Sequence, residues 1–149
     1  MQTFLPYASF VESARCLDYK RLGKQRVEAK QILMALGVEV GGDGNAKGSG
    51  WRHHPAVRMW RWYETALCEY AIAICTEWRL RGYRDSLLNQ FVDTWLRLGS
   101  DGKPPLYPGW LGEERFHASH RGNLLRKDER FYGKYGWMES PDLEYFWPV

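Results

Sequence analysis

The first candidate for chemistry is Glu28, an acid within a basic run. Between Ala14 and Lys30 the chain has six cations and only two acids, Asp18 and Glu28. A carboxylate on a helix that faces phosphate would repel it, so an acid at this place indicates a role other than binding a nucleic-acid backbone. The alternative is a helical i,i+4 ion pair of Lys24 with Glu28, worth only about 0.2–0.5 kcal/mol. Both interpretations stay open on sequence alone.

Two further stretches of the chain are basic. Residues 51–62 contain three arginines and no acid, and residues 115–134 contain six cations against two acids. A fold that brings these stretches together with the first would form a phosphate-binding face. Any one stretch alone is more simply a solvated helix surface.

The histidines stand as a His53-His54 pair and as His117-x-x-His120, whose i,i+3 spacing suits a shared metal. The chain lacks a cysteine pair and the H-E-x-x-H spacing, so we expect no metal, and a histidine beside a phosphate or in a core hydrogen bond instead. No phosphate-binding glycine loop and no G-x-S-x-G elbow is present. These absences exclude the common nucleotide-binding and serine-hydrolase classes, and we expect no cofactor.

The run FYGKYGW at residues 131–137 interleaves aromatic rings, glycines and one lysine. Aromatic faces beside a cation suit stacking on exposed nucleobases. Docking of a terminal segment onto the core explains the same aromatics, and both interpretations remain.

The elements that must position these residues are helical. Apolar residues at helical spacing predict a helix over about 13–36, with Gly23 as a break and Gly37 as a stop. A flexible glycine-rich loop is predicted over residues 38–50. The clearest helix follows Pro55 and runs to Gly82, because its apolar residues step by three and four positions.

A third main helix is predicted from Ser86 to about Leu98, and a shorter one over about 115–127. The prolines in 99–112 predict irregular chain, and residues 131–149 an extended aromatic tail. We therefore expect an all-α fold, a single compact domain over residues 1–149 with three main helices, a long irregular loop and an aromatic tail.

The 149 residues are the length of one domain. Three cysteines without a C-x-x-C pair fit reduced thiols, and no segment reads as a signal peptide or a membrane span. We expect a cytoplasmic, monomeric protein.

Aromatics make up 15% of the chain. By position, Trp60, Trp78 and Trp95 fall on apolar stripes and are expected in the core, whereas Trp51 and Trp137 are expected on a ligand-binding face.

Several of these residues together resemble the pyrimidine-dimer DNA glycosylase family, the phage endonuclease V-like enzymes. The resemblance is carried by Leu17-Asp18, by Arg26-Val27-Glu28-Ala29 and by Gly50-Trp51-Arg52-His53-His54-Pro55. The helix end at 77–83 and the aromatic-lysine tail are similar to the same family.

The resemblance implies an all-α enzyme that binds double-stranded DNA, kinks it and flips out a nucleotide at damaged pyrimidines. It implies that the N-terminal α-amine attacks C1′ of the deoxyribose to form a Schiff base, that a glutamate matching Glu28 assists, and that β-elimination nicks the strand. Gln2 is bulky, so we expect Met1 to be retained and to supply the amine. An α-amine is less basic than a lysine side chain, so more of it is neutral near pH 7.

The residues expected to contact DNA come from the basic stretches and the tail. They are Arg21, Lys24, Arg26, Arg52, His53, His54, Arg58, Arg121, Tyr132, Lys134 and Tyr135. Two other functions stay open: a base-flipping enzyme acting on a modified pyrimidine in DNA, and a non-catalytic module that recognises distorted duplex.

Overall fold

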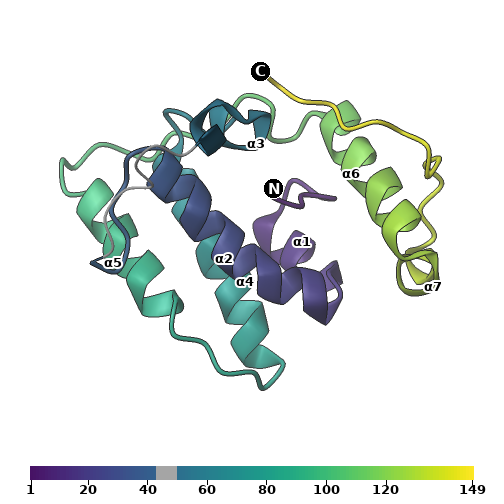
Figure 1. The fold of residues 1–149 in the computed structure, drawn as a ribbon, viewed down its shortest axis with the longest axis horizontal. Coiled ribbons are helices and arrows are strands. Elements are labelled where there is room, and N and C mark those ends of the chain that lie inside the picture. Colours follow the sequence, from purple (N-terminus) through teal and green to yellow (C-terminus); the bar gives the residue numbers. More distant parts are fainter. Residues whose placement is uncertain (43–49) are drawn as a thin grey trace.

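A computed structural model describes residues 1–42 and 50–149 of the protein. The regular structure of these residues is helical (Figure 1). In chain order the elements are α1 (Phe10–Cys16), α2 (Tyr19–Ala35), η1 (Gly50–His53), α3 (Pro55–Arg58), α4 (Glu64–Leu80), α5 (Leu88–Leu98), α6 (Glu114–Lys127), α7 (Glu129–Tyr132) and η2 (Gly133–Tyr135). The expected all-α single domain is confirmed.

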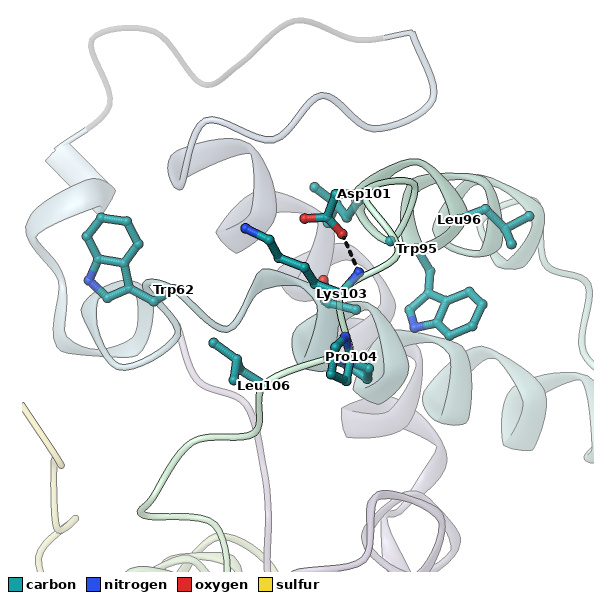
Figure 2. Close-up of a pocket in the computed structure, with 11 residues that line it drawn as sticks. Trp62, Trp95, Leu96, Asp101, Lys103, Pro104 and Leu106 are labelled. Carbon is teal, nitrogen blue, oxygen red and sulfur yellow. Dashed lines mark hydrogen bonds between the residues drawn. The ribbon is translucent and has the colours of Figure 1, made fainter.

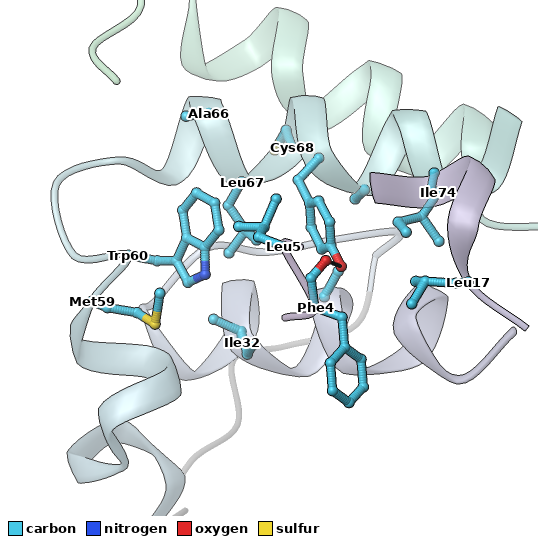
Figure 3. Close-up of a cluster of buried hydrophobic side chains, with 14 of the residues drawn as sticks. Phe4, Leu5, Leu17, Ile32, Met59, Trp60, Ala66, Leu67, Cys68 and Ile74 are labelled. Carbon is cyan, nitrogen blue, oxygen red and sulfur yellow. Dashed lines mark hydrogen bonds between the residues drawn. The ribbon is translucent and has the colours of Figure 1, made fainter. Parts of the chain in front are cut away.

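The centre of the fold is α4, which packs against α1, α2 and α5. The chain start lies on the other side of α2 from α5, between the central helices and α6 (Figure 1). Side chains from α4, from α2 and from residues 4–5 meet in one buried apolar cluster around Trp60 (Figure 3). The first residues of the chain are therefore part of the core.

The first helical region breaks at Asp18, so the expected break at Gly23 is wrong. Asp18 has extended backbone, and its side chain accepts a hydrogen bond from the Arg21 amide at 3.4 Å as the N-cap of α2. Gly23 lies inside α2, where an added Cβ would be 2.8 Å from the Trp78 ring. The glycine therefore permits close approach of α2 and α4.

The expected long helix after Pro55 is two helices. The short α3 ends at Arg58, and the chain turns through residues 59–63 before α4 begins at Glu64. The apolar stripe still reaches one core, because Trp60 on the turn is fully buried. Trp78 and Trp95, the other two tryptophans expected in the core, are only partly buried and pack against the core cluster.

The predicted helices over Ser86–Leu98 and 115–127 correspond to α5 and α6. The tail differs from the expected extended chain, because residues 129–135 form α7 and η2 before the chain becomes irregular. Most of the expected glycine-rich loop, residues 43–49, lies outside the described residues. No helix of the described chain is long and apolar enough to cross a bilayer.

Candidate active site

The N-terminal segment is buried and held from both sides. Leu5 is fully buried, and its amide donates to Nδ1 of His120 at 2.9 Å, while its carbonyl contacts Nδ1 of His117 at 2.8 Å. Two residues earlier, Oγ1 of Thr3 accepts a hydrogen bond from the Trp60 indole at 3.1 Å. These bonds fix the chain start relative to α6 and to the core, so the position of Met1 is set by the fold.

Gln25 on α2 joins the chain start to Glu28. Its side-chain Nε2 donates to the Gln2 carbonyl at 2.8 Å and to Oε2 of Glu28 at 3.0 Å. Its Oε1 accepts from the Phe4 amide at 2.9 Å and from the Tyr70 hydroxyl. Every polar atom of this amide group is thus used, and the group is 1% exposed. One side chain therefore positions both the N-terminal backbone and the carboxylate.

The Glu28 carboxylate lies next to the N-terminal residue. Its Oε2 accepts a hydrogen bond from the Gln2 amide at 3.2 Å, and Oε1 lies 3.6 Å from Nζ of Lys24. The i,i+4 pair considered from sequence is therefore present. However, the Lys24 side chain is 75% exposed, so this pair is screened by water and stabilises little. The buried bonds from Gln2 and Gln25 are what hold the carboxylate.

A hollow of about 390 Å³ opens at this carboxylate. Its walls are Met1, Gln2, Phe4, Lys20, Arg21, Lys24, Gln25, Glu28, Lys127 and Tyr145. Four of these residues are cations and one is an acid, a charge distribution that attracts phosphate. Burial and the positive charges of Arg21, Arg126 and Lys24 lower the pKa of the Lys127 ammonium.

His54 approaches the same terminus from η1 and α3. Partial burial, and then the positive charge of the N-terminal amine, lower the pKa of its imidazole. Its Nδ1 accepts a hydrogen bond from the Ala56 amide at 3.0 Å as the N-cap of α3, so the neutral ring carries its proton on Nε2. The rings of Trp51 and Trp147 lie 5.6 and 5.8 Å from it. The charge of the Met1 amine thus acts on His54, while the next residue in the chain, Gln2, binds Glu28.

Two arginines expected to contact DNA are held in internal ion pairs. The Arg26 guanidinium lies 2.6 Å from Oδ1 of Asp85, a fully buried carboxylate, and over the Trp78 ring. Arg121 binds the carboxylates of Glu114 and Glu139, and its side chain is 11% exposed. Phosphate would have to displace these carboxylates, so the structure gives both arginines a role in packing instead.

The tail docks onto the core, which is the second of the two interpretations considered for its aromatics. Tyr132 is fully buried, and its hydroxyl binds Asp18. The expected stacking of Tyr132 on DNA is therefore corrected, because its ring is out of reach of a ligand. Tyr135 donates from its hydroxyl to the Cys16 carbonyl at 3.0 Å, and the Lys134 ammonium lies 3.9 Å from the Phe131 ring centre.

The other expected DNA contacts lie on the surface. Arg52, His53 and Arg58 are exposed along η1 and α3, and Nε of Arg52 donates to His53 at 3.3 Å. Arg21 lines the hollow but also binds Asp18 at 3.1 Å.

The sequence did not single out Gln25, Lys127 or Tyr145 as residues of this site. Gln25 had a usable signal, because it precedes Glu28 by three positions and so shares its helix face. Lys127 belongs to the basic stretch 115–134, but its meeting with α2 depends on the fold, since it reaches the hollow from about one hundred residues away in the chain. Tyr145 is equally distant and had no signal. No group of three or more metal-ligating side chains occurs within the described residues.

The geometry is that of a basic hollow at the chain start, lined by the N-terminal residue and by one carboxylate. The family model described as pyrimidine dimer DNA glycosylase matches residues 1–90 of the 149. This is more than half of the chain, and the chain belongs to the pyrimidine-dimer DNA glycosylase family. No curated protein and no solved structure matches the chain.

Membership of this family implies DNA glycosylase activity on pyrimidine dimers. The matched residues include Met1, Glu28 and His54, and they end before α6 and the tail. Lys127 and Tyr145 thus lie outside the matched part, although they line the same hollow.

Proposed function

We propose that the protein is a DNA glycosylase with abasic-site lyase activity, which removes pyrimidine dimers from double-stranded DNA through a Schiff base on the Met1 amine. The observation that carries this proposal is the bond from the Gln2 amide to Oε2 of Glu28 at 3.2 Å. It places a buried carboxylate one peptide unit from the terminal amine. The same carboxylate opens onto a basic hollow.

In the glycosylase step, the lone pair of the neutral Met1 amine attacks C1′ of the deoxyribose. The C1′–N bond to the pyrimidine breaks, and the base leaves with the electron pair and takes up a proton. The amine nitrogen loses a proton, the C1′–O4′ bond opens, and O4′ is protonated, which leaves an iminium between C1′ and the nitrogen. Glu28 is the proposed acid that delivers a proton to O4′, because its carboxylate binds the amide of the residue that follows the attacking amine.

In the lyase step, the iminium draws electrons from C2′. A base removes a C2′ proton, a C1′–C2′ enamine forms, and the C3′–O bond breaks with the phosphate as leaving group. The ionised Glu28 carboxylate is the proposed base for this proton. Water then hydrolyses the resulting imine and releases the amine.

The basic walls of the hollow are the proposed binding site for the phosphates on either side of the lesion. Lys20, Lys24 and Lys127 surround the carboxylate and project from α2 and α6. A nucleotide that leaves the duplex must bring its phosphates with it, and unpairing costs least at damaged bases. Base flipping at the dimer is therefore part of the proposal.

The test is a Glu28→Gln variant assayed for strand nicking on UV-irradiated duplex DNA. An amide keeps an oxygen for the Gln2 and Gln25 donors but cannot exchange a proton, so nicking should fall by about 100-fold or more while DNA affinity stays the same or increases. The matched control is Glu12→Gln, an exposed acid of α1, which should nick normally. Normal nicking by Glu28→Gln would refute the assigned role and leave Glu28 as half of an ion pair.

A further inference from the structure

An exposed tryptophan with left-handed backbone joins α3 to α4. Trp62 has a φ of 76°, and it is the one non-glycine residue of the described chain with a positive φ. Its side chain is also 76% exposed. A bulky residue rarely adopts this backbone, and a large ring in water gains nothing from burial. Folding alone therefore gives no reason for a tryptophan here.

The unusual backbone is held in place by neighbouring bonds. The Trp62 amide donates to Oε1 of Glu64 at 3.2 Å, and the Tyr63 amide donates to the Trp60 carbonyl at 2.8 Å. Trp60, two residues earlier, is fully buried and supplies the packing of this turn. The turn thus presents one tryptophan to the core and a second one to solvent.

Three cations line hollows together with the exposed indole. Arg58, Arg61 and Trp62 line one hollow together, and among the described residues no carboxylate pairs with either guanidinium. Lys103 shares with Trp62 a second hollow, of about 650 Å³. In Figure 2 its ammonium extends toward the Trp62 side of this hollow, where Leu106 also lies.

Two nearby acids accept hydrogen bonds from backbone amides, and Val149 also lines the hollow of Arg58 and Arg61. The Glu64 carboxylate binds the Trp62 amide, and Asp101 accepts from the Lys103 amide at 3.0 Å. Unpaired guanidinium groups beside an open aromatic face are the combination that binds phosphates and stacks an unpaired nucleobase. Two guanidinium groups that have no carboxylate partner among the described residues favour a nucleic acid over an apolar partner surface.

The surface follows the candidate active site closely in the chain. Arg58 and Trp62 come four and eight positions after His54, across α3 and the turn through residues 59–63. The N-terminal amine contributes to the lowered pKa of His54, so this part of the chain leads from the terminus to Trp62.

We propose that Arg58, Arg61 and Trp62 form an accessory DNA-binding surface that holds an unstacked base on the indole and its phosphates on the guanidinium groups. This surface engages the strand beside the lesion where pairing is lost. It rests on the proposed function for the nature of the nucleic acid, and it concerns affinity rather than bond breaking.

The experiment measures the affinity of labelled DNA by fluorescence anisotropy at one fixed salt concentration. Two probes are compared, an intact duplex and the same duplex with a four-nucleotide single-stranded gap. Trp62→Gly should weaken binding of the gapped probe about tenfold and of the intact duplex less than twofold. Trp62→Phe should retain most of the affinity, because an aromatic face remains.

The variants separate binding from folding. Glycine adopts a positive φ without strain, so Trp62→Gly should unfold at the same or a higher denaturant concentration than the wild type. Leu80→Ala removes an equally exposed apolar side chain from the far end of α4 and should bind both probes normally. Arg58→Ala with Arg61→Ala should weaken both probes and reduce the salt dependence of binding.

Unchanged affinity of Trp62→Gly for the gapped probe would overturn the proposal and point instead to a protein partner at this surface. The outcome is independent of the lyase chemistry. If the wild type forms no covalent adduct with DNA but Trp62→Gly still loses affinity for the gapped probe, the accessory surface stands and the proposed mechanism fails.

Discussion

At the scale of single residues, the proposed site depends on the position of the chain start relative to the Glu28 carboxylate. Gln25 links the two, since it donates both to the Gln2 carbonyl and to Oε2 of Glu28. In the proposed mechanism it exchanges no proton and forms no bond with the sugar but acts through Glu28, so it is a positioning residue. Its conservative replacement should therefore alter how the reaction depends on pH as well as its rate.

Gln25→Glu keeps the shape and the acceptors of this side chain but replaces its donor with a second carboxylate. Two adjacent carboxylates take up a proton at higher pH than one alone, so the acid limb of the nicking rate should move to higher pH and the maximal rate should fall by about tenfold. The measurement is a pH profile of nicking at saturating DNA. Gln31→Glu adds the same charge on an exposed part of α2 and should leave the profile in place, and an unmoved profile in both variants would remove Gln25 from the account.

At the scale of elements, the sequence predicted which segments are helical and misplaced where they break. Periodicity identified α2, α4 and α5, because each buries an apolar face. It did not show that Asp18 would cap α2 or that the chain would turn at Trp62. Both breaks depend on local hydrogen bonds, and an apolar pattern carries no information about them.

Gly23 illustrates the difference, because it permits a helix contact and does not end a helix. In Gly23→Ala the new Cβ would lie 2.8 Å from the Trp78 ring, which is stacked on Tyr83 with ring centres 4.2 Å apart. We expect a loss of about 1–3 kcal/mol in the free energy of unfolding, measured in urea, despite the better helix propensity of alanine. Gly133→Ala meets open space and should change stability by less than about 0.5 kcal/mol; equal effects of the two variants would contradict the close contact.

At the scale of the whole molecule, hydrogen bonds hold the chain start between α2 and α6. Leu5 and His120 are hydrogen-bonded across 115 positions of sequence, and Tyr145 reaches the site from the tail. Sequence reasoning proposed Glu28 from its basic surroundings, and Met1 and His54 through the resemblance to a family, yet the buried path of residues 2–5 had no local signal. Long-range contacts of this kind depend on the complete fold.

The burial of His120 against the chain start predicts that the protein loses stability in mild acid. Complete burial, with a smaller contribution from His117, lowers the pKa of His120 to about 3 from its ordinary 6.5. The unfolded chain therefore takes up a proton below pH 6.5 that the folded chain refuses, so this stability is present above pH 6.5 and is lost as the pH falls. About 2 kcal/mol should be lost between pH 7 and pH 5 through this residue.

The measurement is the free energy of unfolding in urea at several pH values. His120→Gln offers an acceptor to the Leu5 amide without a titrating ring, so its free energy should fall less steeply between pH 7 and pH 5. The pKa values of His54 and His117 are also lowered, so some slope should remain. If the free energy of unfolding of His120→Gln falls with pH as steeply as that of the wild type, the pH dependence does not come from His120.

The central claim is that the Met1 α-amine is the nucleophile. Reduction with borohydride during the reaction on UV-irradiated duplex converts the iminium into a stable secondary amine, and mass spectrometry of the digested adduct locates the nitrogen. We expect the sugar on the N-terminal peptide, attached to the α-nitrogen of Met1. Attachment to Lys127, whose lowered pKa makes it the competing amine in the same hollow, or no adduct at all, would contradict the account.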